Sequence, residues 1–332
     1  MNAFTKTLAA ASVMISLAGV AQAESTELNF GIISTESQQN LKPQWDPFLA
    51  AMEAQTGLKI NAFYASDYAG VIEGMRFGKV QAAWFGNKSA MEAVDRAGGE
   101  VFAQTVDVAG NPGYWGVLLA HKDSAINSLQ DVLKCDKSLN FGIGDPNSTS
   151  GYLVPMTFVF AANGVDPKTC FKTVRNANHE TNALAVANKQ VDVAANNTEN
   201  LTRIEEGNPK AFANLKVIWK SPLIPADPLV WKADLDSATK QKLMTFIMSY
   251  GRIGAPADVA QARKVMAGLK WAPFRPSSNA QLYPIRVMEY TKEEFRVQAD
   301  EKLSADEKKA KLAEIAAKKA EVEKLLAEVP QL

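Results

Sequence analysis

The chain has 332 residues, of which 47% are hydrophobic, so it can bury one large core or two ordinary ones and is not expected to be disordered. Lys and Arg together number 36, as do Asp and Glu, so no net charge attracts a polyanion and nucleic acid is not expected as a partner. Two histidines, and two cysteines without C-x-x-C spacing, offer few metal ligands. We expect neither a metal nor a cofactor.

Residues 1–23 have the pattern of a secretory signal peptide. Lys6 precedes an apolar run, and Ala21-Gln22-Ala23 supplies an A-x-A cleavage site. The apolar run is too short to span a bilayer, and no later segment offers about 18 unbroken apolar residues. We therefore expect a soluble mature protein that is exported across the inner membrane into the periplasm.

The periplasm is oxidising, so Cys135 and Cys170 either form a disulfide or remain free thiols. Each cysteine comes just before an expected strand, one near Leu139 and the other at Phe171. The two strands can start at the same end of one sheet, which favours the bridge.

An internal repeat organises the chain. Two pairs of segments match at the same offset of 111 residues (28 to 139), and a third pair between them matches in residue type: Leu28–Ile33 with Leu139–Gly144, Val80–Ala83 with Val191–Ala194, and Lys59–Tyr64 with Phe171–Val174. Each half therefore reads strand, helix, strand, helix, strand, which indicates parallel sheets. We predict two similar α/β lobes that form a cleft.

The rest of the chain connects these lobes. Residues 221–228 contain three prolines and predict an extended segment that crosses between the lobes. Helices are expected at 237–250 and 256–267, where they return to the first lobe, so that two crossings form a hinge. The expected division is a first lobe from residues 24–117 and 226–300, a second lobe from 118–225, and a C-terminal helix from 301–332.

The C-terminal helix begins at a capping box, Ser304 with Glu307. Ile315, Val322 and Val329 then repeat every seven residues beside Leu312 and Leu326, which predicts an apolar seam that needs a partner. The seam either folds back on its own lobe or forms a homodimer contact, and the heptad pattern does not distinguish the two.

Gly144–Gly151 lies between an apolar strand and an apolar helical run and is expected to form the first turn of a helix. Ser148, Thr149 and Ser150 place three consecutive hydroxyls there, next to unpaired backbone N–H groups. One hydroxyl alone would be explained by helix capping. Three in a row favour a site for a tetrahedral oxyanion at the helix N-terminus.

Other phosphate and catalytic motifs are missing from the sequence. Asn147 stands where a dinucleotide fingerprint has its third glycine, and there is no G-x-x-x-x-G-K-[ST], G-x-S-x-G or H-E-x-x-H segment. Binding without turnover is the simpler interpretation, so the protein is not expected to be an enzyme.

The repeat offset also pairs Tyr68 with His179, at equivalent strand-to-helix loops that are expected to face the cleft. A lone histidine is more often structural, but near a bound oxyanion its protonated form would be favoured. Glu199 and Asp227 are either solvated or point into the cleft, where they require a cation on the same ligand. Tyr114 would add a phenol donor and an apolar wall.

Four segments carry a resemblance to a known family: Asn29–Ser37, Gly142–Gly151, His179–Ala183 and Trp219–Pro225. Together they resemble the phosphonate-binding periplasmic proteins of ABC importers, over most of the mature chain. The resemblance implies a type II periplasmic binding protein fold, with two α/β lobes that close on the ligand, and delivery to a membrane permease with its ATPase. It implies that Ser148, Thr149, Ser150 and His179 contact the phosphonate and that Tyr68, Tyr114, Glu199 and Asp227 contact the amino end of 2-aminoethylphosphonate. The alternatives are a receptor for phosphate or another oxyanion and an exported phosphonate-processing enzyme.

Overall fold

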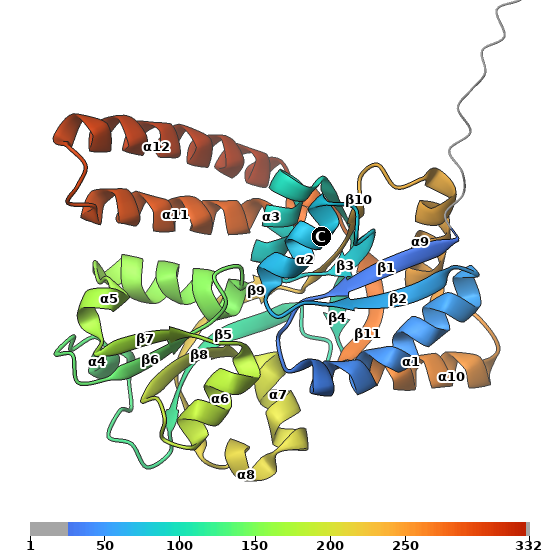
Figure 1. Ribbon diagram of the computed structural model, residues 1–332, viewed down its shortest axis with the longest axis horizontal. Coiled ribbons are helices and arrows are strands. Elements are labelled where there is room, and N and C mark those ends of the chain that lie inside the picture. Colours follow the sequence, from blue (N-terminus) through green and yellow to red (C-terminus); the bar gives the residue numbers. More distant parts are fainter. Residues whose placement is uncertain (1–25, 330–332) are drawn as a thin grey trace, which may run out of the picture.

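A computed structural model of the chain describes residues 26–329 and shows two α/β lobes side by side (Figure 1). The signal peptide expected at residues 1–23 lies outside the described residues. The strands of the first lobe are β1 (Glu27–Ile32), β2 (Lys59–Tyr64), β3 (Ala82–Trp84), β4 (Gly99–Asp107), β10 (Pro228–Lys232) and β11 (Trp271–Pro276). Those of the second lobe are β5 (Gly113–His121), β6 (Asn140–Ile143), β7 (Thr173–Asn176), β8 (Val193–Asn197) and β9 (Leu215–Pro225). The two α/β lobes predicted from the sequence are thus present.

Helices cover both sheets. The first lobe carries α1 (Gln38–Thr56), α2 (Tyr68–Arg76), α3 (Asn87–Ala97), α9 (Ser237–Ser249) and α10 (Pro256–Gly268). The second carries α4 (Leu129–Val132), η1 (Thr149–Leu153), η2 (Met156–Phe160), η3 (Ala161–Asn163), α5 (Pro167–Cys170), α6 (His179–Ala187), α7 (Thr198–Gly207) and α8 (Pro209–Phe212). The chain continues through η4 (Asn279–Leu282) to α11 (Tyr283–Ala299) and α12 (Ala305–Glu328). None of the helices between residues 26 and 329 combines the length and apolar character that a bilayer crossing requires.

The sheets preserve the repeat that the sequence predicts. The strand order is β11-β4-β10-β3-β1-β2 in the first lobe and β7-β6-β8-β5-β9 in the second. β1 pairs in parallel with β2 and β3, as β6 does with β7 and β8. Helix α2 begins at Tyr68 and α6 at His179, so the offset of 111 residues holds for these helices too. Both helices follow the carboxyl end of a parallel strand, where ligands of open α/β sheets bind.

The chain crosses between the lobes twice, and each crossing ends in an antiparallel strand of the other sheet. β5 lies between β8 and β9, and β10 lies between β3 and β4. The expected boundary at residue 117 falls inside β5, whose pairing with β9 begins at Gly113. The first crossing therefore comes earlier, in residues 108–112, and the second occupies residues 226–227 within the proline-dense stretch.

Aromatic packing fixes one wall of the space between the lobes. In the first lobe, Trp45 packs against Trp84 and Trp271, with ring centroids 5.4 and 5.3 Å apart. These rings belong to the core that α9 and α10 complete, as expected from their return to this lobe. Because Trp84 ends β3, the same cluster holds its indole at the carboxyl end of the sheet.

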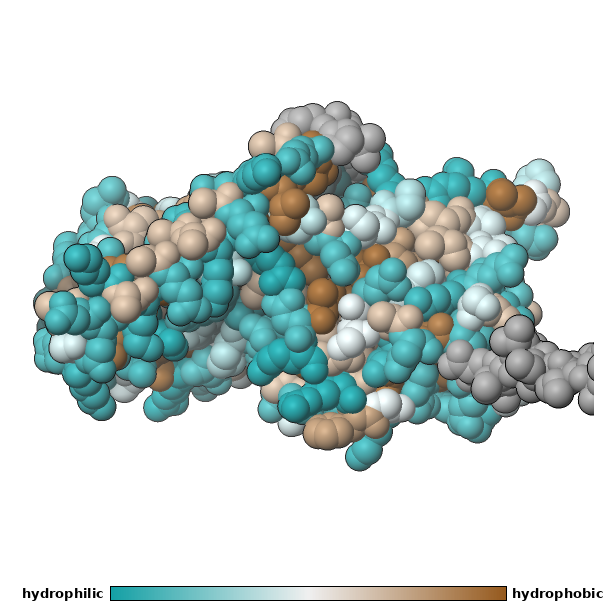
Figure 2. Space-filling view, turned by 90° about the horizontal axis from the view of Figure 1, so that it is seen from above, coloured by the Kyte–Doolittle hydropathy of each residue, from teal (hydrophilic) through white to brown (hydrophobic). Residues whose placement is uncertain are grey.

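The C-terminal helix packs on its own chain. α11 and α12 form an antiparallel hairpin (Figure 1), the capping box of Ser304 and Glu307 is present, and Val322 is 8% exposed. Lys319 of α12 pairs with Glu294 of α11 at 3.0 Å. This is the fold-back alternative for the apolar seam. The face that α12 turns outward is mostly hydrophilic, as the left part of Figure 2 shows.

Cys135 and Cys170 form a disulfide across 35 residues. They precede β6 and β7, which are neighbouring parallel strands. We expect that replacing both cysteines with serine lowers the free energy of unfolding by about 2–4 kcal/mol, because the bridge restricts the unfolded chain. Urea unfolding of the variant, compared with the wild type under oxidising and reducing conditions, measures this change. A reductant that shifts the wild type and the variant equally would contradict it.

Candidate functional site

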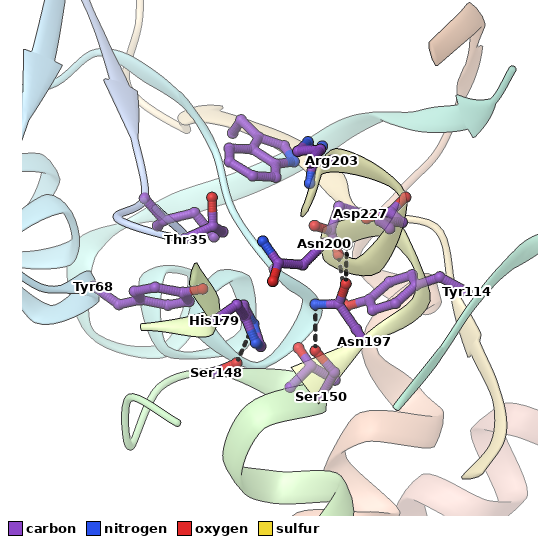
Figure 3. A pocket seen from close by; sticks show the side chains of 15 residues that line it. Thr35, Tyr68, Tyr114, Ser148, Ser150, His179, Asn197, Asn200, Arg203 and Asp227 are labelled. Atoms are coloured by element: carbon purple, nitrogen blue, oxygen red, sulfur yellow. Dashed lines mark hydrogen bonds between the residues drawn. The ribbon is translucent and has the colours of Figure 1, made fainter. Parts of the chain in front are cut away.

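A cavity lies between the two lobes, at the carboxyl ends of their parallel strands (Figure 3). It measures about 20 Å³, little more than the space of one water molecule, so a larger ligand enters only if the lining side chains or the lobes move apart. The structure brings all of the sequence-predicted site residues to this cavity: Tyr68, Tyr114, Ser148, Thr149, Ser150, His179, Glu199 and Asp227. They come from both lobes and from the second crossing, so the cavity is complete only when the lobes are together.

The hydroxyl-bearing turn forms one end of the cavity. Ser148 is the N-cap of η1 and its Oγ accepts a hydrogen bond from the Gly151 N–H at 3.0 Å, so the capping interpretation also holds. The turn is tight, because Gly144 N–H donates to the Gly151 carbonyl at 2.7 Å. A Cβ on Gly144 would lie 2.6 Å from the Gly151 Cα, so no side chain fits at this position.

All three hydroxyl oxygens of this turn already accept a hydrogen bond. Thr149 Oγ1 accepts from the Lys88 N–H at 2.9 Å, and Ser150 Oγ accepts from Asn197 Nδ2 at 3.1 Å. A hydroxyl has one proton to donate and can rotate it toward an acceptor. Each of these oxygens thus already has one donor partner, and the protons of Ser148, Thr149 and Ser150 can turn toward an anion. We call these three residues the hydroxyl nest.

His179 stands beside the hydroxyl nest. Its Nε2 lies 3.4 Å from Ser148 Oγ, and its Nδ1 is buried without a hydrogen-bond partner in the structure. Burial lowers the pKa of His179 to about 4, with a smaller contribution from the nearby positive charge of Arg203. In the closed, ligand-free protein the imidazole is therefore neutral at neutral pH. The protonated form expected from the sequence needs the negative charge of a bound oxyanion.

Two carboxyl groups lie at the acidic corner, which we define as Glu199, Asp227 and Tyr114. Figure 3 shows Asp227 and Tyr114 side by side. The Tyr114 hydroxyl donates to Asp227 Oδ1 at 3.0 Å, and Asp227 is 6% exposed. Burial raises the pKa of Asp227 well above its usual value, and the nearby Glu199 charge raises it further. Burial also raises the pKa of Glu199. Two desolvated carboxyl groups this close together favour a cation between them.

Hydrogen bonds join the lobes around the cavity. The Tyr68 N–H donates to Asp145 Oδ2 at 3.1 Å, and the Ser37 N–H donates to Glu180 Oε2 at 2.9 Å. The Thr149 bond to the Lys88 N–H also crosses between the lobes. The structure is therefore the closed form of the cleft.

Sequence reasoning missed several cavity residues. Four of them have buried polar atoms without a hydrogen-bond partner in the structure: Thr35, Trp84, Asn200 and Arg203. Asn200 stands beside Glu199 and Arg203 lies one helical turn further along α7, so helical spacing could have suggested both. Thr35 and Trp84 follow or end strands of the first lobe, where the repeat predicts cleft residues. In residues 26–329, no cluster of three or more His, Cys, Asp or Glu side chains is arranged to hold a metal.

Comparison with known proteins adds independent information. The family model for the periplasmic substrate-binding protein of ABC phosphonate transporters matches residues 30–282. The phosphonates-binding periplasmic protein of Escherichia coli (strain K12) is 56% identical over 305 residues, 92% of this chain and 88% of that protein. A phosphate-import protein of Mycolicibacterium smegmatis is 33% identical over 230 residues, 66% of this chain and 70% of that protein. The crystal structure of a binding protein component of an ABC phosphonate transporter from Pseudomonas aeruginosa superimposes with a TM-score of 0.88 at 55% identity, covering 92% of this chain and 99% of that one.

Proposed function

Because this chain belongs to the periplasmic substrate-binding proteins of ABC phosphonate transporters, we propose that its ligand is a short aminoalkylphosphonate, 2-aminoethylphosphonate in the first place. Membership in this family establishes the general function and the fold. The protein is a periplasmic binding protein for phosphonates and not an enzyme, and its two mixed sheets form the type II periplasmic binding protein fold, as predicted. The identity of the phosphonate and the role of each cavity residue are the subject of the proposal.

The proposal rests on one observation: a single small cavity offers hydrogen-bond donors for an anion at one end and carboxyl groups for a cation at the other. The hydroxyl nest offers three hydroxyl protons at a helix N-terminus, which suits a phosphonate group. The acidic corner offers one buried carboxyl group, that of Asp227, and one partly buried carboxyl group, that of Glu199, which together suit an ammonium group. A two-carbon linker joins an anion to a cation over the short distance that such a cavity allows.

The ligand acts by favouring the closed state. It contacts the hydroxyl nest on the second lobe and, at its other end, Asp227 in the second crossing, so it binds the closed form more tightly than the open one. The interlobe bonds of Thr149, Asp145 and Glu180 then hold the lobes together. The closed protein docks on the membrane permease, and a separate ATPase supplies the energy. Export of the protein itself relies on the signal peptide expected at residues 1–23.

Calorimetric titration of the refolded, ligand-free protein with 2-aminoethylphosphonate tests the proposal. We expect saturable binding of one ligand per chain, tighter than the binding of methylphosphonate, because only the first ligand occupies the acidic corner. Methylphosphonate binding that equals or exceeds that of 2-aminoethylphosphonate would remove the acidic corner from the site.

Inorganic phosphate is the second candidate, because one relative is named for phosphate import. Phosphate suits the hydroxyl nest but leaves Glu199 and Asp227 without a cation, at a cost in desolvation. Competition between phosphate and 2-aminoethylphosphonate decides between them. We expect that phosphate displaces the aminophosphonate only in large excess, and displacement at equimolar phosphate would favour a phosphate receptor.

Replacing Ser148 with alanine should weaken all phosphonates alike. The expected loss is about 1.5–3 kcal/mol of binding free energy, because a hydrogen bond to a charged group disappears. Thr149→Ala should cost a similar amount and also loosen closure, because Thr149 accepts the Lys88 N–H from the other lobe. Titrations with methylphosphonate and 2-aminoethylphosphonate measure both losses. A loss restricted to the amino-bearing ligand would place these hydroxyls elsewhere in the site.

A further inference from the structure

The ligand cavity is not the only space between the lobes. An outer groove of about 410 Å³ lies next to it, lined by residues of α1 and the loop before it and by residues of α6 and α7. Asn200 and Arg203 line both the ligand cavity and the outer groove. Their side chains therefore form the wall that separates the two spaces, and we call this pair the partition.

The partition is built from buried groups. Asn200 is 1% exposed, and both polar atoms of its side-chain amide lack a hydrogen-bond partner in the structure. The Arg203 side chain is 12% exposed, and its Nε lies 3.6 Å from Glu36 Oε1. Figure 3 shows both side chains at the rim of the cavity, with Asn200 pointing toward its centre.

The partition is assembled only when the lobes close. Arg203 belongs to α7 of the second lobe, whereas Glu36 lies between β1 and α1 of the first lobe. Arg203 Nη2 also reaches the carbonyl of Leu269 in the first lobe at 3.5 Å, and Gln44 Nε2 donates to Glu36 Oε2 at 3.2 Å. Closure thus brings the guanidinium between the two lobes and shuts the cavity on the side of the outer groove.

The partition stands at the acidic corner. Glu199 and Asn200 are neighbours on α7, and the positive charge of Arg203 lowers the pKa values of both Glu199 and Asp227 against the effect of burial. An ammonium group held between these two carboxylates would therefore lie in the part of the cavity that Asn200 and Arg203 also line. A longer ligand that extends from this part of the cavity toward the outer groove would meet the partition, because Asn200 and Arg203 line both spaces.

We propose that Arg203, with Asn200, determines the length of aminoalkylphosphonate that the closed protein accepts. The inference rests on the proposed function. The wild-type cavity takes a primary ammonium on a two-carbon chain, and longer chains require the Arg203 side chain to leave its place between the lobes. Shortening this side chain joins the cavity to the outer groove, which has room for the additional methylenes and for water around the ammonium.

The test compares 2-aminoethyl-, 3-aminopropyl- and 4-aminobutylphosphonate by calorimetry. The readout is the ratio of affinities between the two-carbon and four-carbon ligands within each variant, so that a general loss of affinity cancels. We expect a ratio of at least about 100 for the wild type, since the four-carbon ligand has two additional methylenes and each methylene of misfit costs roughly 10-fold or more. We expect Arg203→Ala to reduce the ratio to about 3 or less.

Arg203→Met is the matched control, because methionine keeps most of the length of the side chain and removes its charge. If bulk determines the selectivity, this variant retains most of the wild-type ratio. Equal loss of the ratio in Arg203→Met and Arg203→Ala would overturn the inference and assign the selectivity to charge. A wild-type ratio in Arg203→Ala would also overturn it.

Asn200→Ala gives a second reading if Arg203→Ala does not fold. It widens the other half of the partition, and we expect it to lower the ratio at least threefold, whereas an unchanged ratio counts against the partition.

The outcomes also separate this inference from the proposed function. A wild type that binds none of the three ligands contradicts both, whereas a wild type that binds all three equally well contradicts only the role of the partition.

Discussion

Replacing Asp227 with alanine is expected to lower the affinity for 2-aminoethylphosphonate at least about 30-fold and to affect methylphosphonate much less. Truncating one partner of a buried charge pair typically costs 2–5 kcal/mol, and Asp227 is a buried carboxyl that faces the proposed ammonium. The hydroxyl nest is untouched by the change, since none of its three hydrogen bonds involves Asp227. Titration of both ligands into the same preparation measures the difference.

Two controls sharpen this prediction. Asp227→Asn keeps the shape of the side chain and an oxygen that can accept from the Tyr114 hydroxyl, so it isolates the loss of charge. Asp46→Ala removes a carboxyl that is half exposed and paired with Lys42 on α1, and it should change neither affinity. Equal losses for the two ligands in Asp227→Ala would mean that Asp227 supports the fold of the cavity rather than the ammonium.

The convergence of the candidate residues on one cavity could be predicted because most of them lie in segments whose local pattern is informative. The hydroxyl nest follows a strand and begins a helix, and the repeat offset relates Tyr68 to His179 at the first positions of α2 and α6. In a parallel α/β sheet such positions converge at one edge. The fold class was predictable for the same reason, since strand-and-helix alternation allows few arrangements.

Helical spacing from Glu199 could have suggested the two residues of the partition, but not their role, because the contacts of Arg203 join segments that are distant in sequence. Nothing in the neighbourhood of Glu36 or Arg203 indicates that closure of the lobes brings them together. The position of the first crossing was also misjudged. The apolar run that contains Tyr114 reads equally well as the end of one lobe or the start of the next, and only its pairing with β9 assigns it to the second sheet.

The affinity for 2-aminoethylphosphonate, relative to methylphosphonate, is expected to rise with pH. In the closed cleft, burial raises the pKa values of Asp227 and Glu199, so a complex without an ammonium, such as that of methylphosphonate, keeps a proton at the acidic corner to a higher pH than exposed carboxyl groups do. An ammonium favours the ionised carboxylates, so the complex of 2-aminoethylphosphonate holds fewer protons. The complex with fewer protons gains stability relative to the other as the pH increases, by up to tenfold in the affinity ratio per pH unit for each proton of difference. The gain ends where the pH exceeds the raised pKa values of the acidic corner without an ammonium.

The affinity for 2-aminoethylphosphonate is compared with that for methylphosphonate because His179, at the phosphonate end of the site, takes up a proton on binding. His179 has a pKa of about 4 in the ligand-free protein, and a bound oxyanion raises it, so this residue takes up a proton with either ligand. That contribution, and the ionisation of the phosphonate itself, largely cancel in the ratio. Titrations between pH 5 and 8, in buffers of different ionisation enthalpy, count the protons released. In Asp227→Asn, the ratio of the two affinities should depend little on pH. A wild-type ratio that does not change with pH would show that the acidic corner is ionised in the closed cleft even without an ammonium.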